Sequence, residues 1–255
     1  MNVRPTITAA IIAVDEARNL CELLPQLSWV DEIVVVDDYS QDETAKIARE
    51  HGCRVVTRSF DSFARQRNAA LSAATSDWVL SIDADERPTP ALVDEIRWRI
   101  AHDRVDAFRV PIRSTIFGRP LRRSGTQNDV PIRLFRRGAA CWTGEVHEVL
   151  RVRGRVGHLR HWLTHRTQSD LNEFLTKMHR YTELDARDRV AAGRSPRAID
   201  RYVAPAREIF RRLIYKQGIF DGPAGWTFCL LSGLYEYVLA DKHRRYWRNQ
   251  HTPFA

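Results

Sequence analysis

The sequence predicts an α/β fold, in which a Rossmann-like mixed sheet is flanked by helices and followed by a helical C-terminal region. Three observations carry this prediction. Apolar runs of strand length alternate with segments of helical spacing over the first hundred residues. These runs are nearly continuous, as in strands that are buried on both faces of a parallel sheet. From about Gln168 onward, helical spacing predominates.

The first hundred residues alternate strand and helix in a regular order. The strand-like runs, which are rich in β-branched residues, lie at residues 7–14, 33–36, 53–56 and 78–82. The helical segments lie at residues 18–27, 42–51, 63–74 and 90–101. Gly52 is a natural C-terminal stop for the second helix, and Pro90 suits the first turn of the fourth helix.

The pattern changes after residue 105. Strand-like segments with polar interruptions lie at residues 107–113, 130–136 and 139–142. A loop rich in Arg, Gly and Ser, residues 119–128, separates the first two of them. We expect these strands to form a mixed or antiparallel extension beside the parallel sheet.

Composition indicates a globular protein with an anionic partner. Of the 255 residues, 44% are hydrophobic, and 40 Lys+Arg against 32 Asp+Glu give a net charge of +8. This charge favours a nucleotide diphosphate, an anionic lipid or a nucleic acid. Because no helix–turn–helix, zinc spacing or aromatic platform motif accompanies it, we expect no specific nucleic-acid binding.

Two features predict a cytoplasmic location. The four cysteines are widely spaced and form no CxxC pair, which is typical of reduced thiols. The first residues lack the apolar run of a secretion signal, and no apolar stretch reaches the roughly 20 residues that span a bilayer. We therefore expect any membrane contact to be peripheral, on the inner face of the cytoplasmic membrane.

The fourth strand ends in a cluster of carboxylates. The run Asp83-Ala84-Asp85-Glu86 follows it and precedes Pro88 and Pro90. Like charges this close repel, so holding them together costs stability unless a cation neutralises them. Mg2+ and Mn2+ prefer oxygen ligands and share carboxylates with a substrate's phosphates. The run predicts a metal–diphosphate site, and the alternative is an acidic turn that caps the next helix.

Three further polar groups lie at the ends of predicted elements. They are Asp15-Glu16, Asp37-Asp38 and Arg65-Gln66-Arg67-Asn68. Because the carboxyl ends of the strands in a doubly wound sheet line one crevice, we expect these groups to meet the Asp83–Glu86 cluster there. Carboxylates can accept hydrogen bonds from a base or ribose, and arginines can pair with a diphosphate. No P-loop or GxGxxG turn is present, which leaves the phosphates to a metal.

Seven segments resemble the family 2 inverting glycosyltransferases and, more narrowly, the lipopolysaccharide core β-1,4-glucosyltransferases. Four of them are IAVDEARNL (12–20), VVDDYSQDET (35–44), ARQRNAAL (64–71) and WVLSIDADE (78–86). The other three are WTGEVHE (142–148), the stretch 165–181 and GIFDGPAG (218–225). Together they cover nearly the whole chain. Val14-Asp15-Glu16 stands where the family usually has Asn-Glu-Glu.

The resemblance implies a GT-A fold and a nucleotide-sugar donor, UDP-glucose in the narrower subfamily. Asp37 or Asp38 would contact the uracil. Asp15 or Glu16 would lie near the base and the ribose, and Arg65 would approach the nucleotide.

The resemblance also implies a metal site. Asp83 would reach the ribose, and Asp85, with Asp83, would hold Mg2+ or Mn2+. Asn68 is a further candidate for nucleotide-sugar binding. Lys177 would meet the diphosphate or an anionic acceptor, and the alternative for Lys177 is a solvated helix face.

The implied reaction is a one-step displacement at the anomeric carbon with inversion, which needs a general base for the acceptor hydroxyl. Our hypothesis for the base is Glu148, with Glu145 and Asp129 as weaker candidates. His147 would hold the base in place or approach the metal. The alternative for His147 and Glu148 is a surface pair at a strand end. His165 is either part of the site or a structural histidine.

The domains and the acceptor follow from the same resemblance. We expect a GT-A catalytic domain over residues 1–165, with a nucleotide-sugar half (1–105) and an acceptor half (106–165), and a helical region over 166–255. The acceptor would be a lipid-anchored glycan, the lipopolysaccharide inner core. A polyprenyl-linked sugar, an exopolysaccharide precursor or a protein is the alternative acceptor. A nucleotidyltransferase would need a phosphate loop with glycine and lysine, which residues 14–20 lack.

The C-terminal region combines an apolar stretch with a basic cluster. Residues 226–240 carry one charge, Glu236, and a cluster rich in Lys and Arg follows at residues 242–248. An apolar stretch bordered by Trp, Tyr and Arg predicts a helix that lies in an anionic membrane interface. The alternatives are packing on the catalytic domain and a dimer seam.

Overall fold

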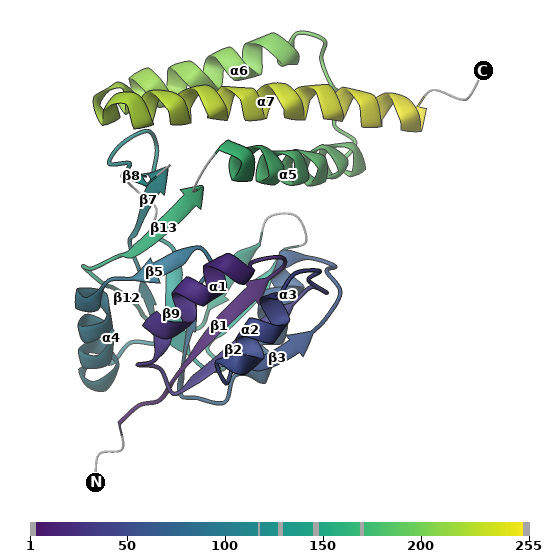
Figure 1. Cartoon of the computed structure of the whole chain (residues 1–255). Coiled ribbons are helices and arrows are strands. Elements are labelled where there is room, and N and C mark those ends of the chain that lie inside the picture. The colour runs from purple at the N-terminus through teal and green to yellow at the C-terminus, as the bar shows by residue number, and fades with distance from the viewer. Residues whose placement is uncertain (1–3, 117, 127–129, 145–147, 169–170, 252–255) are drawn as a thin grey trace. The chain divides into compact units, whose positions relative to one another are not determined.

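The computed structural model describes residues 4–116, 118–126, 130–144, 148–168 and 171–251. The chain forms two compact units (Figure 1). Unit 1 comprises residues 1–112 and 129–165, and unit 2 comprises residues 113–128 and 166–255. The segment 113–128, which we expected in the catalytic domain, thus groups with the C-terminal helices.

Unit 1 is built on a seven-stranded mixed sheet in the order β12-β6-β9-β4-β1-β2-β3. Strands β4, β1, β2 and β3 run parallel, whereas β9 is antiparallel to both β4 and β6. This confirms the predicted parallel half and its antiparallel extension. The bounds are β1 Ile7–Ala13, β2 Glu32–Asp37, β3 Arg54–Thr57, β4 Trp78–Ser81, β6 Ala107–Arg109, β9 Ile132–Arg136 and β12 Val156–His158.

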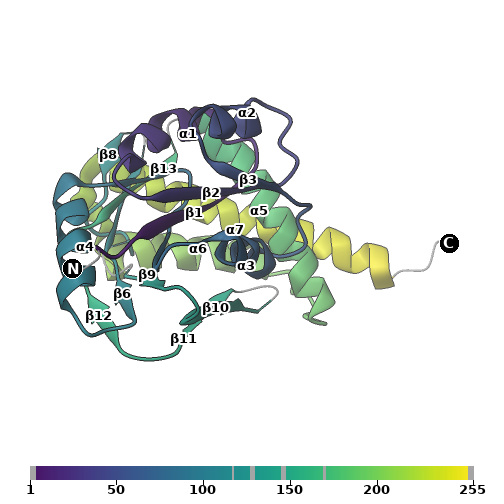
Figure 2. The same ribbon diagram turned by 90° about the horizontal axis from the view of Figure 1, so that it is seen from below.

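Both faces of this sheet are covered (Figure 2). A hydrophobic core lies on each face of the sheet, and alternate residues of β4 pack into one or the other. Trp78 and Leu80 belong to the first core and Val79 to the second. The first face packs against α1 (Ala17–Leu23), the 3-10 helix η1 (Leu24–Leu27), α2 (Thr44–Glu50) and α4 (Pro90–His102). The second packs against α3 (Phe63–Ala73) and the hairpin of β10 (Ala140–Thr143) and β11 (Val149–Val152).

Prolines account for two differences from the predicted elements. The predicted helix 18–27 is divided into α1 and η1, and Pro25 stands in the first turn of η1, where its missing N–H costs no helical hydrogen bond. The predicted strand 107–113 is divided into β6 and β7 (Ile112–Ile116). Pro111 lies between them and cannot donate to a ladder.

A short strand, β5 (Glu86–Pro88), follows the carboxylate cluster and was not predicted, because it is three residues long and ends in a proline. It pairs antiparallel with the start of β13 (Leu163–Gln168), with His165 opposite Glu86. The last residues of unit 1, at the start of β13, therefore lie beside the segment that follows β4.

Unit 2 is mainly helical. Its elements are the strands β7 and β8 (Arg119–Pro120), α5 (Leu171–Ala191), α6 (Asp200–Phe210), the π-helical turn η2 (Arg211–Tyr215), the 3-10 helix η3 (Gly218–Asp221) and α7 (Gly222–His251). Helix α7 packs on both α5 and α6. Gly233 allows a close approach, because a Cβ there would lie 2.5 Å from Ile209 Cγ1 on α6.

The segment 113–128 is held within unit 2 by apolar and polar contacts. Ile116 and Leu121 are buried against Ala224 of α7. Asp221 accepts hydrogen bonds from the backbone N–H groups of Arg122 and Arg123 at 3.1 and 2.9 Å. Within the described residues, no helix is both long and apolar enough to cross a membrane.

Candidate active site

The ends of β1 and β2 are joined through a serine hydroxyl. Asp15 follows β1 with a backbone φ of 53°, and its N–H donates to Ser40 Oγ at 2.9 Å. Ser40 Oγ donates to Asp37 Oδ1 at 2.5 Å. Asp15 Oδ1 accepts from the Gln41 N–H at 2.8 Å. Aspartate tolerates the left-handed conformation better than most residues, so the loop brings Asp15 and Asp37 to the two sides of one hydroxyl.

Glu16 and Asp38 are also tied to neighbouring segments. The Glu16 N–H donates to Thr44 Oγ1 at 2.8 Å, and Asp38 Oδ1 accepts from the Phe60 N–H at 2.7 Å. Tyr39 follows Asp38 with a φ of 47°, and it is 59% exposed. A bulky residue in this region is strained, and such strain concentrates at ligand-binding sites.

Helix α3 carries Arg65 and Asn68. Ser62 caps the helix by accepting from the Arg65 N–H at 3.3 Å, and Arg65 Nη1 lies 3.4 Å from Asp61 Oδ2. Asn68 Nδ2 donates to the Trp142 carbonyl at 2.8 Å, and Asn68 Oδ1 accepts from the Trp142 N–H at 2.9 Å. Asn68 thus links α3 to β10 through two hydrogen bonds. Its contact with a nucleotide stays a prediction.

Arg67 connects the carboxylate cluster to the predicted base. Its Nη2 lies 3.0 Å from Asp83 Oδ1, and its Nε lies 3.6 Å from Glu148 Oε1. The guanidinium also lies 5.0 Å from the centre of the Trp142 ring. Its side chain is only 12% exposed. Asp83 and Glu148 are far apart in the sequence and meet around one nearly buried arginine.

A second arginine holds Asp83 from the other side. Arg133 Nη2, from the second residue of β9, lies 2.8 Å from Asp83 Oδ2 and 2.7 Å from Glu86 Oε1. The Asp83 N–H donates to Glu86 Oε2 at 2.9 Å. Arg133 and Glu86 are buried. Asp83 is therefore neutralised by two protein cations without a metal.

These contacts push the pKa values of Asp83 and Glu86 apart. Burial disfavours the Asp83 anion, but the charges of Arg133 and Arg67 outweigh it and hold the pKa of Asp83 well below its usual range. Burial raises the pKa of Glu86 above its usual range, with Arg133 opposing this shift and Asp83 reinforcing it. The pair thus favours an ionised Asp83 beside a proton-retaining Glu86.

Asp85 lies next to His165, with 3.3 Å between Asp85 Oδ2 and His165 Nε2. Burial disfavours the imidazolium, but the hydrogen bond and the charge of Asp85 outweigh it and raise the pKa of His165. When the imidazole is neutral, the carboxylate and the ring nitrogen can share a divalent cation. Among the described residues, no three His, Cys, Asp or Glu are grouped to hold a metal. A metal here would therefore need oxygens from a ligand's phosphates.

Other predicted site residues are placed differently or fall outside the description. His147, Glu145 and Asp129 lie outside the described residues. Lys177 lies on α5 in unit 2, and its contact with a diphosphate stays a prediction. Glu148 is described, and its side chain is 25% exposed.

The sequence-based prediction gives Arg133 no role, and it expects Arg67 to pair with a diphosphate rather than with Asp83 and Glu148. A signal for Arg133 is nevertheless present, because it interrupts the apolar run from Ile132 to Phe135. A charge within a central strand is rarely buried unless it is paired, so it indicates a carboxylate partner. Nothing local identifies Glu86 as that partner, since the contact depends on the pairing of β9 with β4.

Comparison with known proteins shows a family match and a relative of similar length. The family described as Glycosyl transferase family 2 matches residues 10–152. The lipopolysaccharide core biosynthesis glycosyltransferase LpsC of Rhizobium meliloti is 28% identical over 246 residues. These residues cover 92% of this chain and 91% of LpsC.

Two solved structures have a similar fold. TarS 1-349 of S. aureus, in complex with UDP-GlcNAc, has a TM-score of 0.51 and 14% identity, and the match covers 98% of this chain and 94% of the TarS 1-349 chain. The mannosyltransferase PcManGT of Pyrobaculum calidifontis, in complex with GDP-Man and Mn2+, has a TM-score of 0.52 and 15% identity. That match covers 95% of this chain and 88% of PcManGT. At these identities the likeness concerns the fold alone.

Proposed function

The chain belongs to glycosyl transferase family 2 and has the GT-A fold, and from this we propose that it transfers glucose from UDP-glucose to a lipid-anchored glycan. The proposed acceptor is the inner core of lipopolysaccharide, which the similarity to LpsC supports. One observation carries the proposal: Asp83, which follows β4, and the predicted base Glu148 both lie next to Arg67. A transfer from a sugar diphosphate to an acceptor hydroxyl needs a base close to the donor site, and this proximity supports the proposal.

We assign the donor to the ends of β1 and β2. Asp37 or Asp38 would accept from the uracil N–H, and Asp15 or Glu16 would lie near the ribose. The exposed ring of Tyr39 lies on the same loop and offers a face on which a base can stack. The structures of TarS and PcManGT are complexes with UDP-GlcNAc and GDP-Man, respectively, so the choice of uracil here is part of the proposal.

We assign the metal to Asp85 and His165, with the donor diphosphate as the source of its other ligands. Asp83 was predicted as a second ligand, but its oxygens already face Arg67 and Arg133. Asp83 therefore suits a hydrogen bond to the ribose. When bound, Mg2+ or Mn2+ would stabilise the negative charge on the departing diphosphate.

In the proposed step, the acceptor oxygen attacks the anomeric carbon while the bond from that carbon to the diphosphate oxygen breaks. The two electrons of that bond leave with the diphosphate, and the configuration inverts. Glu148 accepts the proton of the acceptor hydroxyl. Arg67, 3.6 Å away through Nε, positions the Glu148 carboxylate.

The donor is tested by binding and hydrolysis of UDP-, GDP-, ADP- and CMP-sugars with Mn2+, Mg2+ or EDTA. We expect metal-dependent use of UDP-glucose that is lost in Asp85→Ala. Asp94→Ala is a matched control, because Asp94 is exposed on α4, away from these contacts. If no nucleotide sugar binds with any metal, the glycosyltransferase assignment of this site fails.

The acceptor is tested with core lipopolysaccharide that lacks the transferred sugar, compared with a polyprenyl-linked sugar, an exopolysaccharide precursor and protein. We expect transfer to the lipopolysaccharide core. The anomeric configuration of the product, read by NMR, tests inversion. A lipid-anchored acceptor also requires access to the membrane, and we propose peripheral attachment to the inner face of the cytoplasmic membrane through unit 2.

A further inference from the structure

Exposed apolar side chains gather on one part of unit 2. More than half of the large apolar side chains that are exposed within the described residues lie between residues 199 and 237. The six most exposed, which we call the apolar face, are Tyr215 at 76%, Phe220 at 73%, Tyr202 at 68%, Phe210 at 64%, and Ile199 and Leu230 at 60% each. Single exposed apolar residues are ordinary, but a dense set marks an interaction surface.

The backbone of this region favours the exposure. Helix α6 contains Pro205, continues into the π-helical turn η2, and ends before Gln217, which has a φ of 59°. A π turn shifts the side chains that follow around the helix axis, and such turns are frequent at functional sites. Here both Ile214 and Tyr215 are exposed to solvent.

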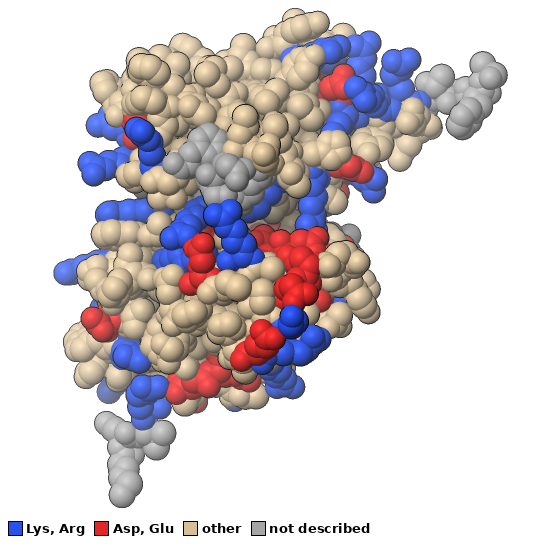
Figure 3. Space-filling view, in the orientation of Figure 1, with Lys and Arg blue, Asp and Glu red and all other residues tan. Residues whose placement is uncertain are grey.

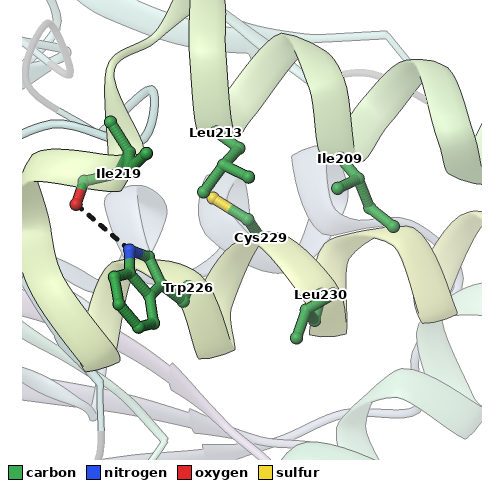
Figure 4. A pocket seen from close by; sticks show the side chains of 6 residues that line it. All are labelled: Ile209, Leu213, Ile219, Trp226, Cys229 and Leu230. Carbon is green, nitrogen blue, oxygen red and sulfur yellow. Dashed lines mark hydrogen bonds between the residues drawn. The ribbon is translucent and has the colours of Figure 1, made fainter.

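A pocket of about 160 Å3 is formed by apolar side chains of the same elements (Figure 4). Its lining residues are Ile209, Leu213, Ile219, Trp226, Cys229 and Leu230. The Trp226 Nε1–H is already donated to the Ile219 carbonyl at 3.1 Å. Burial raises the pKa of the Cys229 thiol, so this side chain stays neutral. The pocket therefore suits a hydrocarbon rather than a polar ligand.

Cations accompany the exposed rings. Three ring–cation pairs show this, with distances to the ring centre of 4.9 Å for Phe220–Arg123, 5.6 Å for Tyr215–Lys216 and 5.9 Å for Tyr202–Arg201. Aromatic rings with adjacent Lys and Arg are typical of protein surfaces that lie in the interfacial layer of a bilayer.

The charge of this region selects an anionic partner. Five cations lie between residues 200 and 216, namely Arg201, Arg207, Arg211, Arg212 and Lys216. Glu208, one of the two acidic residues there, is already bound by Arg211 and Arg212, each at 2.6 Å. In Figure 3 the surface over α6 and α7 carries few charges, with Lys and Arg toward its margins. A second copy of the chain would oppose these cations with its own.

We propose that the apolar face inserts into an anionic phospholipid bilayer and that the pocket receives part of a lipid acyl chain. The membrane contact then lies on α6, η2, η3 and the start of α7, and the basic cluster 242–248 is dispensable for it. The inference rests on the proposed function for its biological purpose. Binding to a bilayer itself needs neither donor nor acceptor.

The first test is cosedimentation of the full chain with vesicles. We expect binding to phosphatidylcholine vesicles that contain phosphatidylglycerol, little binding to phosphatidylcholine alone, and weakening by salt. Phe220→Ser and Tyr215→Ser should each lower the partition coefficient on the order of tenfold. Trp98→Ser, an exposed aromatic of α4, is the matched control and should have no effect.

Charge variants locate the contact. Lys216→Gln and Arg123→Gln should each weaken binding roughly fivefold. Arg244→Gln and Arg248→Gln, which are exposed in the basic cluster, should leave it unchanged. Equal binding to uncharged vesicles, or losses confined to Arg244→Gln and Arg248→Gln, would overturn the proposal.

The second test addresses the pocket. Phosphatidylglycerol that carries bromine on its acyl chains should quench tryptophan fluorescence, and Trp226→Phe should remove the quenched component. Quenching that is unchanged in Trp226→Phe would overturn the pocket assignment.

A dimer in solution that Phe220→Ser dissociates would assign the apolar face to a second copy instead. Hydrolysis of UDP-glucose in solution by the same variants should match that of the wild type, so it separates failure of this inference from failure of the proposed function.

Discussion

Replacing Arg133 by Met should destabilise unit 1 by about 3–5 kcal/mol. Glu86 is 1% exposed, and Arg133 is its cationic partner at 2.7 Å. Asp83 keeps Arg67 at 3.0 Å, so the loss falls mainly on Glu86, which would stay buried beside the Asp83 charge. Without Arg133, Glu86 either remains as an uncompensated buried charge or takes up a proton and loses its hydrogen-bonding partner, and both outcomes cost stability. Domains are typically stable by only about 5–15 kcal/mol.

The cause can be isolated by a double-mutant cycle. Adding Glu86→Gln to Arg133→Met should restore about 1–3 kcal/mol, because the amide is uncharged and its oxygen can still accept from the Asp83 N–H. Arg151→Met, at an exposed position of β11, is the matched control and should change stability by less than about 0.5 kcal/mol.

The assay is unfolding in urea, monitored by hydrogen exchange of the backbone amides of β4 and β9. These amides report on unit 1 alone, which matters because two compact units need not unfold together. The reasoning is refuted if Arg133→Met costs no more than Arg151→Met. It is also refuted if the double variant is as unstable as Arg133→Met alone.

Three further predictions concern the site and the helices. The raised pKa of Glu86 means that the folded state holds its proton more tightly, so stability should fall as pH rises from 4.5, the ordinary pKa of Glu, to about 7, the pKa of Glu86 in the folded state. Glu86→Gln should flatten this slope in urea midpoints, and an unchanged slope would contradict the assignment. Glu148→Gln should fold normally, bind donor as the wild type does in calorimetry, and lose transfer by about 10²–10⁴-fold; near-normal turnover would exclude Glu148 as the base. Gly233→Ala should cost about 1–3 kcal/mol in thermal unfolding, because its Cβ would meet Ile209 Cγ1 at 2.5 Å. Ile209→Ala in the same chain should then be less harmful than in the wild type, and simple additivity would count against the clash.

The parallel half of unit 1 could be predicted because its signals are local. Nearly continuous apolar strands, the helix stop at Gly52 and the helix start at Pro90 each act within a few residues. The division at Pro111 was also available locally, since the missing N–H is a property of the residue itself. These features need no knowledge of which strands are neighbours.

Contacts between segments that are far apart in the sequence could not be predicted from local sequence patterns. The motif around residues 64–71 predicts a binding helix, but the pairing of Asn68 with Trp142 depends on where β10 lies. The carboxylate cluster was recognised, whereas its two arginines come from α3 and β9. The grouping of 113–128 with unit 2 depends on Asp221, which follows roughly a hundred residues later. No periodicity encodes such a contact.

The contact of Ile116 and Leu121 with α7 also has a consequence for how the protein is made. At roughly 5–20 residues per second, these side chains leave the ribosome on the order of 10 s before α7 is complete. During that interval they lack the helix that later buries them, although much of unit 1 has already been synthesised. The nascent chain should therefore expose an apolar segment from its middle to chaperones, and a chain that stops before residue 222 should remain in that aggregation-prone state.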